Sequence, residues 1–257
     1  MFDKDCPFDA IPYEENDTPA HHAVALTAAE ESMVLLKNDG ILPLHDKSCK
    51  TIAVIGPNAD TVEILKGNYN GTATEHYTLL DGIRAVAKAE NPELRLMVSE
   101  GCHLWRENVE ALAEADDRRS EAVAMARRAD VVILCVGLNG TLEGEEGDAN
   151  NSYAGADKVD LLLPLPQRRL IREVAAVGTP IVLVNATGSA MALGEEAELC
   201  NAVLQVWYPG QMGGLAAAEV LFDKNNPSGK LPVTFYRTTE ELPPFTEYAM
   251  QGRTYRF

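Results

Sequence analysis

Residues 130–148 read DVVILCVGLNGTLEGEEGD, an apolar run followed at once by glycine and then by carboxylates. The run at 131–136 is apolar throughout, which is typical of a strand buried on both faces of a parallel sheet. The glycine and acidic residues after it predict a loop at the carboxyl end of that strand, where ligands gather in open α/β sheets. This stretch therefore predicts both the fold class and a candidate site.

Similar apolar runs and helical patterns alternate along the rest of the chain. Alternating strands and helices predict an α/β three-layer sandwich with a mostly parallel, flavodoxin-like sheet and helices on both faces. Thr27 followed by Glu30 predicts a capping box for one more helix, which would end at 38–40. The other expected strands are 51–55, 95–98, 181–184 and 203–206, and the expected helices are 79–89, 118–128, 167–177 and 213–222.

The carboxylates after the central strand are candidates for proton transfer. Glu143, Glu145, Glu146 and Asp148 lie so close in sequence that we expect at least one to have a raised pKa and to donate a proton. An equally weighted alternative is a solvated loop in a protein that is acidic throughout. A calcium loop is a weaker alternative, because the spacing misses that of an EF-hand. We expect no cofactor and no metal.

Composition excludes several classes of partner. A formal charge of −17 would repel nucleic-acid phosphate and anionic lipid, so we expect neutral substrates, with no nucleic acid and no membrane as partners. No apolar stretch is long enough to span a bilayer. The five cysteines are scattered and contain no CxxC, which favours a reducing, cytoplasmic compartment. An extracellular location stays open if a signal peptide lies upstream.

A series of motifs in order along the chain resembles the C-terminal α/β sandwich domain of glycoside hydrolase family 3. The variants most similar to LEGEEGD belong to β-xylosidases and related β-glucosidases. The resemblance implies a retaining, exo-acting β-glycosidase that removes terminal non-reducing sugars from oligosaccharides. Besides 130–148, the motifs are ESMVLLKNDGILPL (31–44), IAVIGPNAD (52–60), GNYNGT (67–72), LPLPQRRLI (163–171), VWYPGQMGGLAAAEVLF (206–222) and NPSGKLPVTF (226–235).

The resemblance also implies roles within the acidic loop. The usual pattern is Glu-x-Glu-Gly-x-Asp-Arg, with the general acid/base among its glutamates. Its first glutamate falls on Glu143, which we take as the acid/base, with Glu145 as the rival. Asp148 falls on the aspartate and is expected to order the loop. Ala149 stands where the pattern has arginine, and the glycine is displaced by one residue.

The GNYNG loop resembles one that borders the family's sugar pocket. Tyr69 and Asn70 therefore become candidate substrate-binding residues, since an aromatic face and an amide suit a pyranose. Packing of Tyr69 in the core or on the surface is equally weighted. His76 is the one histidine that we place near a site, and the residues at 207–209 are interpreted as structural.

The resemblance further implies neighbouring domains. We expect 1–20 to be a linker from a missing upstream (β/α)8 barrel that carries the aspartate nucleophile, 21–245 to be the sandwich domain, and 246–257 to begin a linker to a missing downstream domain. The isolated chain would then be inactive, and Glu143 would be exposed. The alternative hypothesis is a non-catalytic carbohydrate-binding or scaffolding domain with a degenerate acidic loop.

Overall fold

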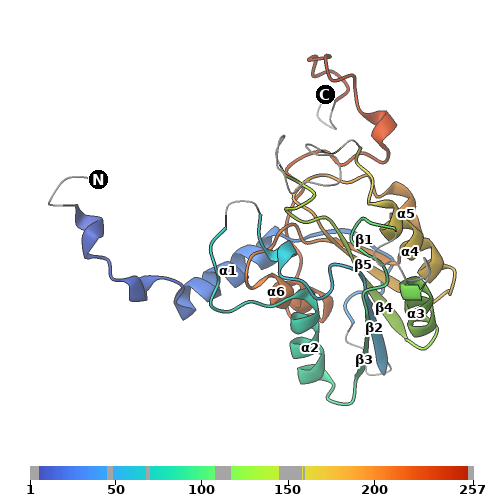
Figure 1. Cartoon of the computed structure of the whole chain (residues 1–257), viewed down its shortest axis with the longest axis horizontal. Helices are drawn as coiled ribbons and strands as arrows, with labels where there is room; N and C mark the ends of the chain where they lie inside the picture. The colour runs from blue at the N-terminus through green and yellow to red at the C-terminus, as the bar shows by residue number, and fades with distance from the viewer. Residues whose placement is uncertain are drawn as a thin grey trace.

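The computed structural model describes residues 6–44, 49–67, 70–107, 117–144, 158 and 160–253. Its centre is a six-stranded sheet with the strand order β1-β6-β5-β4-β2-β3 (Figure 1). All neighbouring strands are parallel except β1, which pairs antiparallel with β6 at one edge. The strands are β1 Val34–Asn38, β2 Thr51–Ile55, β3 Arg95–Ser99, β4 Val131–Gly137, β5 Ile181–Ala186 and β6 Ala202–Gln205.

Successive side chains of each strand point to opposite faces, so the sheet carries two separate cores. Val54, Ile133 and Val184 belong to one core, with α1, α2 and α6 packed over it, whereas Ile55 and Leu134 belong to the other, under α3, α4 and α5. Figure 1 shows these two helical layers on either side of the sheet. The helices are α1 Pro19–Ser32, α2 Leu79–Glu90, α3 Asp117–Ala126, α4 Leu165–Ala175, α5 Gly194–Leu199 and α6 Gly213–Leu221.

The predicted fold class is confirmed. Counting only the parallel strands, the order is 2-1-3-4-5, which is that of flavodoxin. All five predicted strands are present, and so are the four helices predicted at 79–89, 118–128, 167–177 and 213–222. The ends of these elements are shifted by at most two residues. The short helix α5 was not predicted.

The helix predicted from Thr27 was wrong in both its start and its extent. Helix α1 begins earlier, where Thr18 caps it by accepting a hydrogen bond from His21 N. Thr27 lies inside the helix, and its hydroxyl donates to Ala23 O at 3.1 Å. The chain leaves the helix at Met33 and forms β1, whose hydrogen bonds go to the distant strand β6. A long-range pairing therefore overrides the local helical pattern.

Helices α2 and α6 approach each other unusually closely. A Cβ added to Gly82 would lie 1.9 Å from Gly214 O, so the two backbones touch where glycine stands. This contact fixes the first turn of α6 beneath the loops at the carboxyl edge of the sheet. On the far side of α1, the segment with η1 Pro7–Ala10 and η2 Tyr13–Glu15 extends away from the body of the molecule (Figure 1). A last turn, η4, spans Thr239–Glu241.

Candidate active site

The acidic loop starts at the carboxyl end of β4, and Gly137 and Gln167 fix that start. Gly137 has a φ of 130°, and a Cβ there would lie 2.0 Å from Ala186 O, so glycine lets β4 run close to the end of β5. The Gln167 side chain accepts a hydrogen bond from Gly137 N and donates one to Gly137 O, both at 2.8 Å. The last residue of β4, from which the loop starts, is thus held both by its pairing with β5 and by Gln167.

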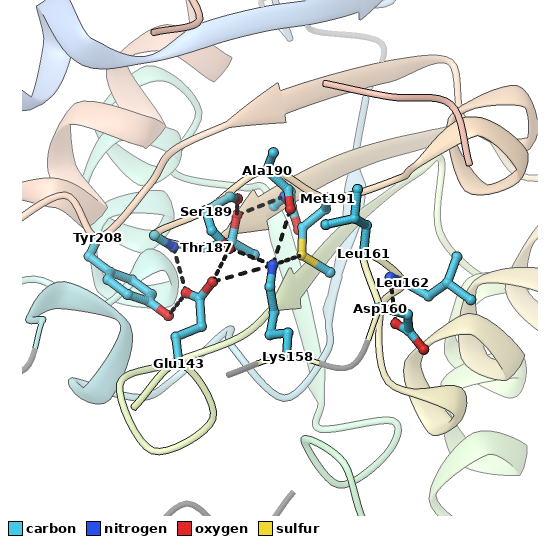
Figure 2. Close-up of polar contacts among 12 residues, drawn as sticks. Glu143, Lys158, Asp160, Leu161, Leu162, Thr187, Ser189, Ala190, Met191 and Tyr208 are labelled. Atoms are coloured by element: carbon cyan, nitrogen blue, oxygen red, sulfur yellow. Dashed lines mark hydrogen bonds and ion pairs between the residues drawn. The ribbon is translucent and has the colours of Figure 1, made fainter. Parts of the chain in front are cut away.

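A tight turn at Asn139 then directs the chain to Glu143. Leu142 N and Glu143 N both donate to Asn139 O, at 2.9 and 3.1 Å. The Asn139 side chain accepts from Thr141 N at 3.0 Å, and Leu142 is buried in the core. With the turn held by these contacts, the Glu143 side chain reaches the residues that follow β5 and β6 (Figure 2).

Each contact of the Glu143 carboxylate among the described residues brings it a hydrogen or a positive charge. Gly188 N donates to Oε2 at 2.7 Å, and the Tyr208 hydroxyl donates to the same oxygen. The Ser189 hydroxyl donates to Oε1, and Lys158 Nζ lies 3.7 Å from Oε1. Glu143 therefore acts as an acceptor in this arrangement, with both oxygens engaged.

The electrostatics of two of these partners agree with that role. Burial raises the pKa of Tyr208, and the negative charge of Glu143 raises it further. The phenol therefore stays protonated and donates a hydrogen bond to Glu143. Burial lowers the pKa of Lys158, whereas Glu143 opposes that shift. The Glu143 carboxylate thus favours the charged form of the Lys158 ammonium.

The expectation of an exposed Glu143 was wrong. Its side chain is only 11% exposed, because its four partners enclose the carboxylate. Gly188 and Ser189 come from NATGSA (185–190), the segment in which β5 ends, and the structure brings both residues to Glu143. Tyr208 and Lys158 were missed, since Tyr208 was interpreted as structural and Lys158 follows Glu143 by fifteen positions.

A hollow of about 350 Å³ adjoins this cluster. Glu143, Lys158 and Ser189 line one part of it, and Asp160 and Thr239 line another. The cluster is thus reached from the surface through a pocket that mixes carboxylates, an ammonium and hydroxyls. Such a lining suits a small polar ligand.

A second and larger hollow, of about 920 Å³, lies between the start of α1 and the loop that contains Asn70. Asn70 and His76 line it together with His21, as do Gly210 and Gln211. The Asn70 amide is partly engaged, because its Nδ2 donates to Gly67 O at 2.8 Å. Asn70 and His76 thus line the same hollow, and their contact with a sugar stays a prediction.

Asp17 holds the wall of this groove together. Thr74 donates its backbone N–H to Asp17 Oδ2 at 2.7 Å, and its hydroxyl donates to the same oxygen. Gln211 Nε2 donates to Oδ1 at 3.1 Å, and His22 Nε2 lies 2.8 Å from Oδ1. The hydrogen bonds from Thr74, followed by that from Gln211, hold the pKa of Asp17 well below its usual range.

The turn 207–211, which follows β6, joins the two hollows. Tyr208 contacts Glu143 beside the smaller hollow, and Gln211 contacts Asp17 beside the larger one. Trp207 enters the turn with a φ of 62°, and its indole donates to Ser32 O at 2.9 Å. Tyr208, which was interpreted as structural, thus contacts Glu143 directly, and Gln211 of the same turn contacts Asp17.

Four predicted site residues, Tyr69, Glu145, Glu146 and Asp148, lie outside the described residues. Across the described ranges, no three His, Cys, Asp or Glu side chains gather as a metal site would require. Within the same ranges, no helix is long and apolar enough to cross a membrane.

Comparison with known proteins decides the family. A model of the glycosyl hydrolase family 3 C-terminal domain matches residues 33–257, most of the chain. The chain belongs to glycosyl hydrolase family 3. The resemblance seen in the motifs is thereby confirmed.

Relatives of this family 3 domain include plant and bacterial enzymes. It is 36% identical over 261 residues to the probable β-D-xylosidase 7 of Arabidopsis thaliana, covering 98% of the chain and 31% of that protein. It is 34% identical over 266 residues to a periplasmic β-glucosidase of Salmonella typhimurium, covering 97% and 33%.

A solved structure gives the same result for the fold. The family 3 exo-β-xylosidase bound to a xylobiose aziridine probe superposes with a TM-score of 0.77 at 30% identity, covering 93% of this chain and 29% of that one. The chain thus spans about a third of the length of these three proteins.

Proposed function

We propose that this domain supplies the general acid/base of a retaining, exo-acting β-glycosidase of the β-xylosidase or β-glucosidase type. The observation that carries the proposal is the acidic loop of a family 3 domain, which opens at Glu143 beside a hollow at the carboxyl edge of the sheet. The names of the relatives, a β-D-xylosidase and a β-glucosidase, support β-xylosides and β-glucosides as the class of substrate.

Retaining hydrolysis needs two carboxyl groups about 5 Å apart. One forms the glycosyl-enzyme, and the other protonates the leaving oxygen and later activates water. We place the nucleophile on an upstream (β/α)8 barrel joined through 1–20 to the domain at 21–245, with 246–257 leading to a further domain. The isolated chain would then bind weakly and turn over no substrate.

Two glutamates are candidates for the proton donor, and the contacts of Glu143 bear on the choice between them. The sequence favours Glu143 over Glu145. The contacts of Glu143 reverse that order in our proposal, because a general acid must present its own proton to the leaving oxygen. Glu143 instead receives hydrogen bonds from Tyr208, Ser189 and Gly188 at both of its oxygens. We therefore assign proton transfer to Glu145, and we retain Asp148 as the residue that orders the loop.

Substrate contacts are assigned to the larger hollow. Asn70 and His76 would offer hydrogen bonds to sugar hydroxyls from its wall, and Tyr69 would stack on the apolar face of the ring. Selection among xylose, glucose and arabinose would rest mostly on the barrel.

Activity assays test the proposal. The full-length gene product should hydrolyse aryl xylosides or glucosides, and the isolated chain should not; turnover by the chain alone would contradict the two-domain site. Glu145→Ala in the full-length protein should abolish hydrolysis of substrates with poor leaving groups. On substrates with good leaving groups, azide should partly restore the turnover of this variant. Unchanged rates in both Glu145→Ala and Glu143→Ala would favour the carbohydrate-binding or scaffolding alternative.

A further inference from the structure

The residues on either side of the acidic segment 145–157 attach to one turn. Lys158 Nζ donates to the Ser189 hydroxyl, to Ala190 O at 3.1 Å and to Met191 Sδ at 3.3 Å (Figure 2). Glu143 accepts from Ser189 of the same turn. Ser189 is therefore shared, because its oxygen accepts from Lys158 while its hydrogen goes to Glu143. The chain therefore contacts this turn at Glu143 and again at Lys158.

We propose that Glu143 and Lys158 form an ion-pair clamp that holds the chain on both sides of the acidic segment to the turn 187–191. What the clamp positions rests on the proposed function, namely the proton donor Glu145. Glu143 is then a positioning residue.

The clamp has a rigid base beneath it. The Thr187 hydroxyl donates to Ser189 O at 2.9 Å, and Gln205 Nε2 donates to Thr187 O at 3.2 Å. Asn185 Nδ2 in turn donates to Gln205 Oε1 at 2.6 Å, across the paired strands β5 and β6. Asn185, Thr187 and Gln205 are all fully buried. Because this ladder is part of the sheet, the turn that receives both ends of the segment cannot shift independently of it.

The burial of the pair makes the attraction strong. The side chains of Lys158 and Glu143 are 15% and 11% exposed. The chain also holds a matched surface pair, Lys224 and Glu90, at 2.6 Å but with exposed fractions of 45% and 48%. A pair screened by water contributes little, whereas a desolvated pair couples its partners. The two pairs therefore allow a controlled comparison.

A double-mutant cycle on the chain itself tests the clamp without reference to catalysis. Glu143→Gln and Lys158→Met should each lower the urea midpoint of unfolding, and the double variant should lower it by clearly less than the sum. The matched cycle of Glu90→Gln and Lys224→Met should be additive. Additive shifts for Glu143 and Lys158 would overturn the clamp. If Lys158→Met does not fold, Lys158→Arg and Ser189→Ala replace it, with Arg expected to retain the midpoint and Ala to lower it.

Kinetics of the full-length gene product test the positioning role. Lys158→Met and Glu143→Gln should lower kcat by up to about 100-fold, equally for good and poor leaving groups, with no rescue by azide and recovery in Lys158→Arg. Azide rescue and leaving-group dependence in Glu143→Ala would make Glu143 the donor and overturn the positioning role. The two experiments can also disagree. Non-additive urea midpoints for the Glu143 and Lys158 variants, together with unchanged hydrolysis by the full-length Glu145→Ala variant, would reject the proposed function but support the clamp.

Discussion

Asp17 and Glu143 are held by nearly the same set of donors, yet they differ in what stands opposite the carboxylate. Each accepts from a backbone N–H and a neighbouring hydroxyl, and each receives a side chain of the turn 207–211. Asp17 otherwise faces His22, whereas Glu143 faces the largely buried ammonium of Lys158. The same hydrogen-bonding motif thus joins segments at Asp17 and also neutralises a buried charge at Glu143.

This difference predicts unequal costs of removal, and the largest is at Glu143. Glu143→Ala leaves the ammonium of Lys158 without its counter-charge, so we expect the free energy of unfolding to fall by about 3 kcal/mol. Urea denaturation of the chain measures it. Glu90→Ala, at the exposed pair with Lys224, is the control and should cost less than about 1 kcal/mol. Equal losses would remove the distinction between the two kinds of site.

The buried ladder beneath Glu143 gives the next effect. Gln205→Leu strips hydrogen bonds from Asn185 and Thr187 in the core, and we expect a loss of about 2 kcal/mol in the free energy of unfolding. Thermal unfolding followed by circular dichroism provides the measurement. A variant as stable as the parent would mean that the turn holding Glu143 does not depend on the ladder.

Asp17 should show its contribution as a dependence on pH. Its pKa in the folded chain lies below the usual 3.8, so its stabilisation is present above that value and is lost as the pH falls towards the folded pKa. Asp17→Asn should therefore lower the melting temperature more at pH 5 than at pH 3. Its effect at pH 5 should be smaller than that of Glu143→Ala, since Asn leaves no buried charge unpaired. A pH-independent difference would contradict the assignment.

Glu219 is the contrasting case of a carboxylate that faces another carboxylate, and its effect should be the smallest. It lies on α6, and burial together with Glu30 of α1 raises its pKa to about 7. The folded state then binds the proton more tightly than the unfolded chain, whose value is near the usual 4.5. Its contribution to stability falls as the pH rises from about 4.5 to about 7.

The Glu219→Gln variant isolates this term. Gln cannot ionise, so the difference in melting temperature between parent and variant should change across that pH range and be constant above it. Glu30→Gln should have a similar effect, because it removes the other member of the pair. A difference that does not vary with pH would show that the two carboxylates do not interact.

Much of the fold could be predicted because its signals are local. The apolar run at 131–136 and its four counterparts mark the parallel strands by composition alone. Strand β1 was missed because its evidence lies in β6, far along the chain, and α5 was missed because six residues carry little periodicity.

The candidate site divides in the same way. Glu143 could be picked out because it stands just after a predicted strand. Its partners could not, since Gly188, Ser189 and Tyr208 are 45, 46 and 65 positions away. The proximity of Lys158 depends on where the chain returns after the segment 145–157, which no local pattern specifies.

The return of the chain to Ser189 has a consequence for variation in length. Thirteen residues, 145–157, lie between two ends that are fixed at nearly one point. The entropy of closing such a segment grows only with the logarithm of its length, so doubling it would cost about 0.6 kcal/mol. Insertions, deletions and whole exchanges between Gly144 and Lys158 should therefore leave the sheet intact. The base formed by Glu143, Ser189 and Lys158 makes this position a natural graft point for segments from other members of the family.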